Sequence, residues 1–223
     1  PPDRHRQSSA WVLLPGNARR QWRALLDRFG EIRAYVSASR FNSVERGSGD
    51  GFGVITTGLA RNYFLENLDD LPARPAHLHV GAYPYPVETI RDFVAPLTRV
   101  LLLEEGYPYV ERALRGIVPP ARLEIQGRES GAVPADGELN PDLVRAALGL
   151  PARAGVSLPG LSLPARPPQL CAGCPHGDSF HSITSVLAAF PDAIVTADIG
   201  CSTLGALPPY NAIETCVCMG ASV

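Results

Sequence analysis

The chain has 223 residues, 45% of them apolar and 19% charged, which suits one large or two small folded domains and excludes a disordered protein. Its formal net charge of −2 gives no electrostatic reason to expect a nucleic-acid partner, and no apolar run reaches the length of a membrane span. The polar start at Pro1 is neither a Met nor a secretory signal, so we interpret it as a cut in a longer, cytoplasmic protein.

The first 150 residues alternate predicted strands with predicted helices. Residues 1–50 are interpreted as a lead-in from an upstream domain, with one helix at 17–29 and a flexible glycine-rich connection at 46–51. Strands are predicted at 53–57, 77–80 and 100–103, and helices at 59–68, 87–95, 107–114 and 140–148, the last capped by Asn140 and ended by Gly149. This alternation predicts an α/β domain at 51–150, with a parallel sheet and helices on its faces.

A second, shorter region follows a proline-rich segment. Five prolines make 151–169 a linker, so we expect a new domain to begin at about residue 170 and to be truncated at 223. Its first helix should run to about Phe190, with Phe180, Ile183, Leu187 and Phe190 on one apolar stripe. A buried strand is predicted at 193–197.

Two compositional features bear on chemistry. Every one of the 20 basic residues is Arg, which excludes Schiff-base chemistry and a lysine-based phosphate loop within this chain. All five Cys lie in the last 53 residues, and this clustering favours a metal, cluster or redox site over a secreted disulfide scaffold.

The motif Cys171-x-x-Cys174-Pro-His176 is the first candidate site. Two thiolates at this spacing can hold one metal ion or one edge of a cluster. By itself the motif fits half a zinc site, a thioredoxin-like pair, two ligands of an iron–sulfur cluster, or two unliganded thiols at a helix cap. His176 gains weight because it adjoins Cys174, whereas His181 is expected to be a cap or surface residue.

The loop after the predicted strand 193–197 is the second candidate site. Ligands of open α/β folds bind outside the carboxyl ends of strands, where Asp198, Gly200, Cys201, Ser202 and Thr203 stand in sequence. Cys201 could converge there with the earlier pair of thiols. The sequence has no Lys or Arg after residue 166, so a diphosphate would need backbone amides and a divalent metal. The alternative is an ordinary turn of small residues.

Other polar residues are expected to be structural. His77 and His79 alternate on one strand and should share a face that packs or meets solvent. Glu104 and Glu105 end the third strand and are expected to cap it or to make a domain contact. A fourth thiol ligand could come from Cys216, Cys218 or sequence beyond residue 223, although buried core thiols are the default for those two.

Together these motifs resemble the large subunit of the indolepyruvate ferredoxin oxidoreductases, a branch of the thiamine-diphosphate-dependent 2-oxoacid:ferredoxin oxidoreductases. The resemblance rests on RPPQLCAGCPH at 166–176, TADIGCSTLGALPP at 196–209 and NAIETCVCMGAS at 211–222. The first region is similar to that family's transketolase C-terminal-like domain through GVITTG at 53–58, YPYP at 83–86, LLEE at 102–105 and GELNPD at 137–142. The resemblance also implies that residues 170–223 begin the thiamine-diphosphate-binding domain.

The resemblance implies a reaction and its cofactors. Aryl 2-oxoacids such as indolepyruvate would be oxidatively decarboxylated with coenzyme A while ferredoxin is reduced. Thiamine diphosphate, Mg²⁺ and a 4Fe–4S cluster would be the cofactors, and a small beta subunit the partner. By this resemblance the cluster ligands are Cys171, Cys174 and Cys201, while the loop from Asp198 through Gly200 to Ser202 lines the diphosphate and His176 lies at the cofactor site. Catalytic residues are expected outside this chain, which alone should be inactive.

Two other functions stay open. A non-oxidative thiamine-dependent decarboxylase would use the same loop but leaves the cysteines without a role. A zinc-stapled interaction module would need four ligands within the chain.

Overall fold

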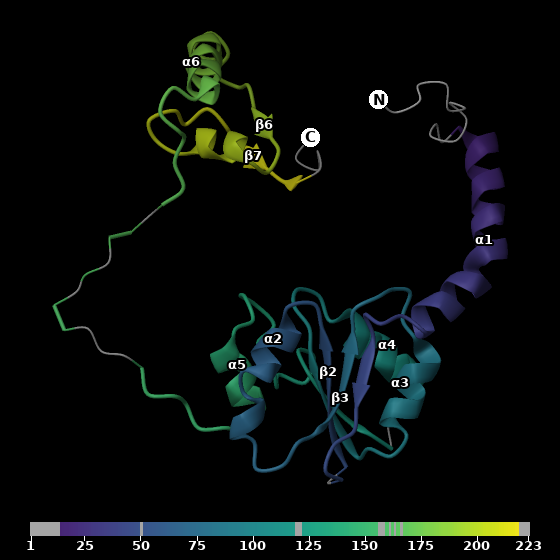
Figure 1. Ribbon diagram of the computed structural model, residues 1–223. Coiled ribbons are helices and arrows are strands. Elements are labelled where there is room, and N and C mark those ends of the chain that lie inside the picture. The colour runs from purple at the N-terminus through teal and green to yellow at the C-terminus, as the bar shows by residue number, and fades with distance from the viewer. Residues whose placement is uncertain are drawn as a thin grey trace. The chain divides into compact units, whose positions relative to one another are not determined.

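A computed structural model describes residues 14–49, 51–118, 122–155, 159–160, 162, 164–165 and 167–218 (Figure 1). The chain divides into two compact units, unit 1 at Pro1–Gly155 and unit 2 at Val156–Val223. The described residues leave out the start of the lead-in, Asp50 of the 46–51 connection, several positions of the linker, Arg166 of the 166–176 motif and the end of the 211–222 motif.

Unit 1 begins with a long helix. Helix α1 spans Pro15–Ser37, so the helix predicted at 17–29 is confirmed and continues for two more turns. It passes through Gly30 because Ile32 and Val36 continue the apolar spacing of the first half. Within the described part of the chain, none of the helices combines the length and apolar composition that a membrane crossing requires.

A five-stranded sheet forms the centre of unit 1. Its order is β1-β3-β2-β4-β5, with strands at Ser43–Glu45, Ala76–Val80, Phe52–Thr57, Arg99–Leu103 and Glu124–Gln126. Strands β2, β3, β4 and β5 are parallel, and β1 is an antiparallel edge strand. In the register of the three central strands, Ile55 lies opposite Leu78 on one side and Leu102 on the other. The predicted parallel α/β fold is therefore confirmed.

Helices cover both faces of this sheet, as Figure 1 shows. On one face lie α2 (Ala60–Leu65), the 3-10 helix η2 (Leu68–Asp70) and α5 (Pro141–Ala147), which pack with Val54, Leu101 and Leu103 in one apolar cluster. On the other face α3 (Val87–Val94) and α4 (Tyr109–Ile117) pack with Ile55, Leu78 and Leu102. Successive residues of a strand point to opposite faces, so continuous apolar runs fill both clusters.

The local signals at α5 act as the sequence indicated. The Asn140 side chain accepts a hydrogen bond of 2.9 Å from the backbone N–H of Leu143, and Pro141 opens the helix. Gly149 follows the end of the helix with φ +74°, a left-handed conformation that favours glycine.

Unit 2 is built from small elements. It contains α6 (Pro175–Leu187), β6 (Thr196–Ala197), the 3-10 helix η3 (Cys201–Ala206) and β7 (Thr215–Cys216), and β6 and β7 pair in parallel. The buried core of its described residues comprises Phe180, Ala212 and Ile213. Helix α6 and η3 approach closely at Gly205, where a Cβ atom would lie 2.6 Å from the Phe180 ring.

The buried strand predicted at 193–197 is wrong. Strand β6 has two residues, Ile194 is 70% exposed, and Phe190 at the end of the predicted helical stripe is 60% exposed. Val195 and Ala197 pack against the Phe180 cluster and are half-buried, whereas Ala193 and Ile194 are exposed.

Candidate functional site

A tight turn holds the Cys-x-x-Cys pair. The backbone N–H of Cys174 donates to the carbonyl of Cys171 at 3.1 Å. Gly173 makes this turn possible because its φ of +71° lies in the left-handed region that favours glycine. Cys174 is the residue that precedes α6, and Pro175 opens that helix. The turn therefore brings both thiols to the start of one helix.

Both thiols line a hollow of about 250 Å³. Its walls are Leu170, Cys171, Gly173, Cys174, Gly177, Asp178, His181 and Tyr210. Positions 174, 177, 178 and 181 recur at helical spacing, so the sequence could have indicated this shared face. Tyr210 was not predicted from the sequence, because it lies far along the chain from the other lining residues. Its ring contacts those of Phe180 and His181, at centroid distances of 5.1 and 5.2 Å.

His176 and His181 flank the pair differently. The Nδ1 atom of His176 lies 3.3 Å from the Cys174 sulfur, within hydrogen-bond distance for sulfur. His181 is exposed and lines the hollow one turn further along α6, which gives it a place the sequence did not indicate. The hollow is thus lined by two thiols, a carboxylate, an imidazole and a phenol. A second imidazole, that of His176, lies within hydrogen-bond distance of the Cys174 thiol.

The loop 198–203 is held by its own hydroxyl and carboxylate groups. The Ser202 hydroxyl donates to the Asp198 carbonyl at 2.7 Å, and the Asp198 carboxylate accepts the N–H of Ile199 at 2.7 Å. The Gly200 N–H donates to the Thr203 hydroxyl at 3.3 Å. Gly200 has φ +147° and ψ −159°, a conformation that is essentially restricted to glycine.

The five thiols are free and are not gathered at one point. No group of three or more His, Cys, Asp or Glu side chains in the described residues is placed to hold a metal ion, so Cys201 does not join Cys171 and Cys174 here. Cys216 is half-buried, with its sulfur 3.2 Å from the Thr203 hydroxyl. Cys218 is exposed, so its assignment as a core thiol is wrong.

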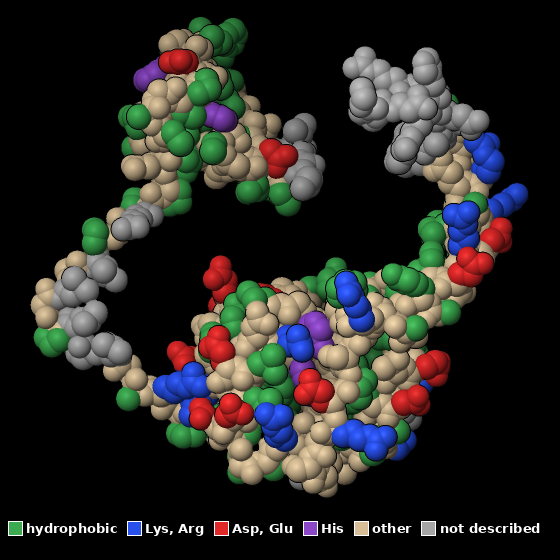
Figure 2. Space-filling view, in the orientation of Figure 1, with side chains coloured by type: hydrophobic (Ala, Val, Ile, Leu, Met, Phe, Trp, Pro, Cys, Tyr) green, Lys and Arg blue, Asp and Glu red, His purple; other side chains and the backbone are tan. Residues whose placement is uncertain are grey.

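The charges around the site have one sign. The sequence has no Lys or Arg after residue 166, and the acids beyond it are Asp178, Asp192, Asp198 and Glu214. Accordingly, the face of unit 2 in Figure 2 carries no blue side chain. A bound anion would be held here by backbone amides, hydroxyls and a metal cation.

In unit 1 the predicted histidine pair forms a hydrogen-bonded group with Thr56, in which His77 is buried and His79 is half-buried. The Thr56 hydroxyl lies 2.9 Å from His77 Nε2 and 3.0 Å from His79 Nδ1, within hydrogen-bond distance of both rings. Burial lowers the pKa of His77 to about 4 and also lowers the pKa of His79. His77 Nδ1 lies 4.0 Å from the Glu45 carboxylate, beyond hydrogen-bond distance. Packing, one of the two expectations for this pair, is confirmed.

The carboxylates after β4 are structural, as expected. Both oxygens of Glu104 accept hydrogen bonds at 2.9 Å from the N–H groups of Val110 and Glu111 at the start of α4. Burial raises the pKa of Glu104, and these two donors oppose that rise. Glu105 points elsewhere and accepts the N–H of Leu139 at 3.0 Å.

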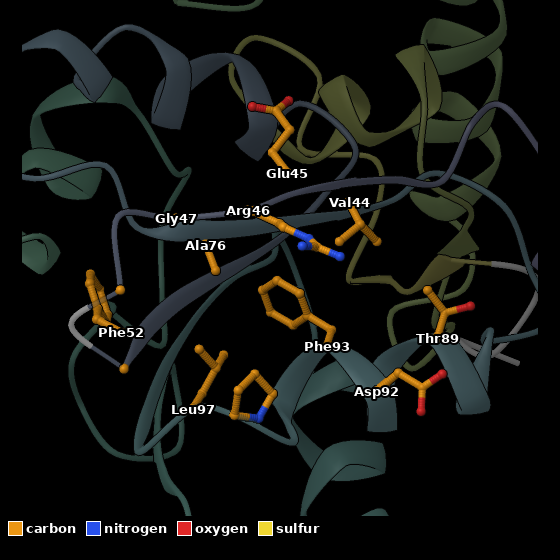
Figure 3. A pocket seen from close by; sticks show the side chains of 13 residues that line it. Val44, Glu45, Arg46, Gly47, Phe52, Ala76, Thr89, Asp92, Phe93 and Leu97 are labelled. Carbon is orange, nitrogen blue, oxygen red and sulfur yellow. The ribbon is translucent and has the colours of Figure 1, made fainter.

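Unit 1 also has a larger hollow, of about 620 Å³, between edge strand β1 and helix α3 (Figure 3). Phe93, Leu97 and Ala76 form its apolar floor, and Asp92 and Thr89 lie on α3 at its side. It contains none of the predicted site residues. We therefore place the candidate site at the smaller hollow, which contains the thiols.

No family model matches the sequence, and no solved structure matches it. Similar proteins exist: indolepyruvate oxidoreductase subunit IorA of Archaeoglobus fulgidus is 35% identical over 99% of this chain and 36% of its own length. The subunit of the same name from Methanothermobacter thermautotrophicus is 35% identical over 96% of the chain, and that from Thermococcus kodakarensis is 32% identical over 96%.

The chain spans about 36% of the length of the Archaeoglobus and Methanothermobacter relatives. The similarity nevertheless covers 99% and 96% of this chain, and so runs through both units. The chain is thus homologous, over nearly its whole length, to a stretch of indolepyruvate oxidoreductase subunit IorA, which confirms the family that its motifs indicated.

Proposed function

We propose that the chain is part of an enzyme that oxidatively decarboxylates aryl 2-oxoacids such as indolepyruvate. Coenzyme A would take the acyl group and ferredoxin the electrons, and a small beta subunit would complete the enzyme. The relatives' name supports the substrate and the reaction class. The observation that carries the proposal is the pair of thiols at one turn, in a hollow they share with Asp178, His181 and Tyr210.

The turn fits one edge of an iron–sulfur cluster. Its two sulfur ligands are three residues apart on a backbone whose conformation Gly173 fixes. Cysteine thiolates are the usual ligands of such clusters. We assign Cys171 and Cys174 as ligands and Cys201 as the third. Because Cys201 stands apart from the pair here, the third bond requires the start of η3 to move toward the turn.

The loop 198–203 fits the diphosphate only in part. Gly200 leaves space beside the backbone, since a Cβ atom there would meet nothing within 4 Å, and Ser202 and Asp198 supply oxygen atoms. With no cationic side chain nearby, Mg²⁺ must neutralise the phosphates. Bound thiamine diphosphate would supply the carbanion and electron sink that decarboxylation needs. His176 would then orient the Cys174 thiol at the edge of the cofactor site.

The reaction is tested on the assembled enzyme. We expect indolepyruvate to reduce ferredoxin only when coenzyme A and thiamine diphosphate are present. Release of carbon dioxide without ferredoxin reduction would instead identify a non-oxidative decarboxylase. Tightly bound zinc with no decarboxylation would identify the interaction module, although the described residues assemble no four-ligand site. The isolated 223-residue chain is expected to be inactive and to bind thiamine diphosphate weakly or not at all.

A further inference from the structure

Helix α1 carries an apolar seam that the described residues of unit 1 bury only at Val36, leaving Phe29 and Ile32 half-buried and Trp22 and Leu25 exposed. The seam consists of Ala18, Trp22, Leu25, Phe29, Ile32 and Val36. Their spacing alternates four and three residues, which is the a/d pattern of a coiled coil. Val36 is the one buried residue of the helix, whereas Trp22 is 60% and Leu25 41% exposed. Leu26 and Tyr35 extend the apolar surface on its two sides and are 52% and 78% exposed.

Hydrogen bonds join the C-terminal end of α1 to the rest of unit 1. The Asn42 side chain donates to the carbonyl of Val36 at 2.9 Å and accepts the N–H groups of Gly81 and Ala82 at 3.0 and 3.1 Å. One residue therefore joins the end of α1 to the end of β3.

Arginines flank the seam. In the heptad that places Trp22 at position a, Arg19 and Arg33 occupy position e and Arg28 occupies position g. The helix Pro15–Ser37 has five Arg against two acids, Asp27 and Glu31, a formal charge of +3. Figure 2 shows blue and red side chains along α1. Positions e and g determine which partner a coiled coil accepts.

These flanks argue against a second copy of the chain. In a parallel pair, Arg28 at position g would face Arg33 at position e of the other copy. In an antiparallel pair, Arg28 would face Arg28, and Arg19 would face Arg33. Like charges at these positions oppose association, so the seam calls for a partner with acidic flanks.

We propose that α1 is a docking helix for an acidic amphipathic helix. Its source is the part of an IorA-type subunit outside the stretch matched by this chain, because nearly two thirds of the relatives' length lies there. The proposal rests on the family and not on the cofactor chemistry, so it can fail independently of the proposed reaction. The a/d spacing with arginine at the flanking positions matches the geometry of a partner helix, and vesicles serve below as the test of a membrane surface.

Trp22 reports directly on the seam. The chain has two Trp, so Trp11→Phe leaves Trp22 as the only one. We would titrate this protein with two synthetic helical peptides that share a Leu/Ile seam and carry either Glu or Arg at the flanking positions. The Glu peptide should shift Trp22 emission to shorter wavelength and saturate. The Arg peptide should bind at least about tenfold more weakly, and salt should narrow the difference.

Two arginine variants form a matched pair. Arg28→Gln removes a charge beside the seam, whereas Arg20→Gln removes the same charge from the opposite face at position f. Only Arg28→Gln should weaken the binding of the Glu peptide. Circular dichroism checks that both variants stay helical. Equal binding of the two peptides, or no shift with either, would overturn the proposal. So would a shift on concentrating the protein alone, or with vesicles of phosphatidylcholine and phosphatidylglycerol.

The source is tested by hydrogen exchange in the assembled enzyme. The amides of α1 between Trp22 and Val36 should exchange more slowly there than in the isolated 223-residue chain. The protection should be independent of enzyme concentration and should be lost with Leu25→Asp. Equal exchange in the two forms would contradict the assignment.

Discussion

The two units differ in how much of their own apolar surface they bury. Unit 1 encloses a sheet between helices and has a buried cluster on each face. The core of the described residues of unit 2 comprises Phe180, Ala212 and Ile213, and large side chains such as Ile194 and Ile199 stay exposed. Yet every residue assigned to the cluster or the diphosphate lies in unit 2. The candidate chemistry therefore sits on local turns and close contacts, while unit 1 has the packing of a scaffold.

A matched pair of core substitutions should show this difference most strongly. Leu102 in β4 is 1% exposed, so Leu102→Ala should lower the free energy of unfolding of unit 1 by about 3 kcal/mol. Ile194, also in an apolar run, is 70% exposed, so Ile194→Ala should change that of unit 2 by less than about 0.5 kcal/mol. Urea unfolding followed by circular dichroism gives both values, and a similar cost at the two sites would break the comparison.

Acidification should weaken unit 1 through its buried histidine. The pKa of His77 is about 4 in the folded state and 6.5 in its reference state, so the unfolded chain binds more protons between these values. The stability that unit 1 gains by keeping His77 neutral is fully present above pH 6.5 and is lost as the pH falls toward 4. The total loss in the free energy of unfolding is about 3 kcal/mol. His77→Gln should flatten this dependence in urea titrations across that range. Some slope should stay, because the pKa of His79 is lowered too.

His181→Gln is the control for that experiment, because the His181 side chain is exposed in unit 2. It should leave the pH dependence of the unfolding of unit 1 unchanged, because the substituted residue lies in unit 2. If both variants behaved alike, the Thr56–His77–His79 group would not be the origin of the acid sensitivity.

The same substitution at two glycines should have opposite effects in the two units. Gly200 has φ +147°, so Gly200→Ala should destabilise unit 2 by about 1–3 kcal/mol although a Cβ atom would meet nothing. Gly116 lies in α4 with equally open space, so Gly116→Ala should stabilise unit 1 by about 0.5–1 kcal/mol. A stabilising Gly200→Ala, measured by thermal unfolding, would mean that the loop does not need this backbone conformation.

The last prediction concerns a helix cap in unit 1. Asn140→Ala removes the acceptor for the Leu143 N–H and should lower the stability of unit 1 by about 1 kcal/mol. Asn140→Ser should restore most of that loss, since serine also caps helices well. A loss shared equally by the two variants would assign the effect to packing and not to the cap.

The sequence predicted unit 1 better than unit 2, for a physical reason. Strands β2, β3 and β4 are buried on both faces and separated by helices with local start and stop signals, so their patterns are complete in themselves. Strands β1 and β5, of three residues each, were not predicted, because such short edge strands depend on their pairing partners. Val44 pairs with Leu78, and Ile125 pairs with Val100.

In unit 2 the local sequence patterns gave one wrong prediction and gave none for a residue that lines the site. The run 193–197 has strand character, but only Thr196 and Ala197 form a strand, and Ile194 is exposed. The Cys171–Cys174 turn was readable because both thiols and Gly173 are adjacent. Tyr210 was not, because it reaches the hollow from a distant segment. The joining of Cys201 to the pair stays a prediction.

The most direct test of the account is anaerobic iron and sulfide analysis of the assembled enzyme, with wild type compared to Cys171→Ala plus Cys174→Ala. We predict that the double variant loses about four iron atoms per subunit, the content of one cubane cluster. Unchanged iron in the double variant would contradict the account and leave the turn a structural or thiol-redox role.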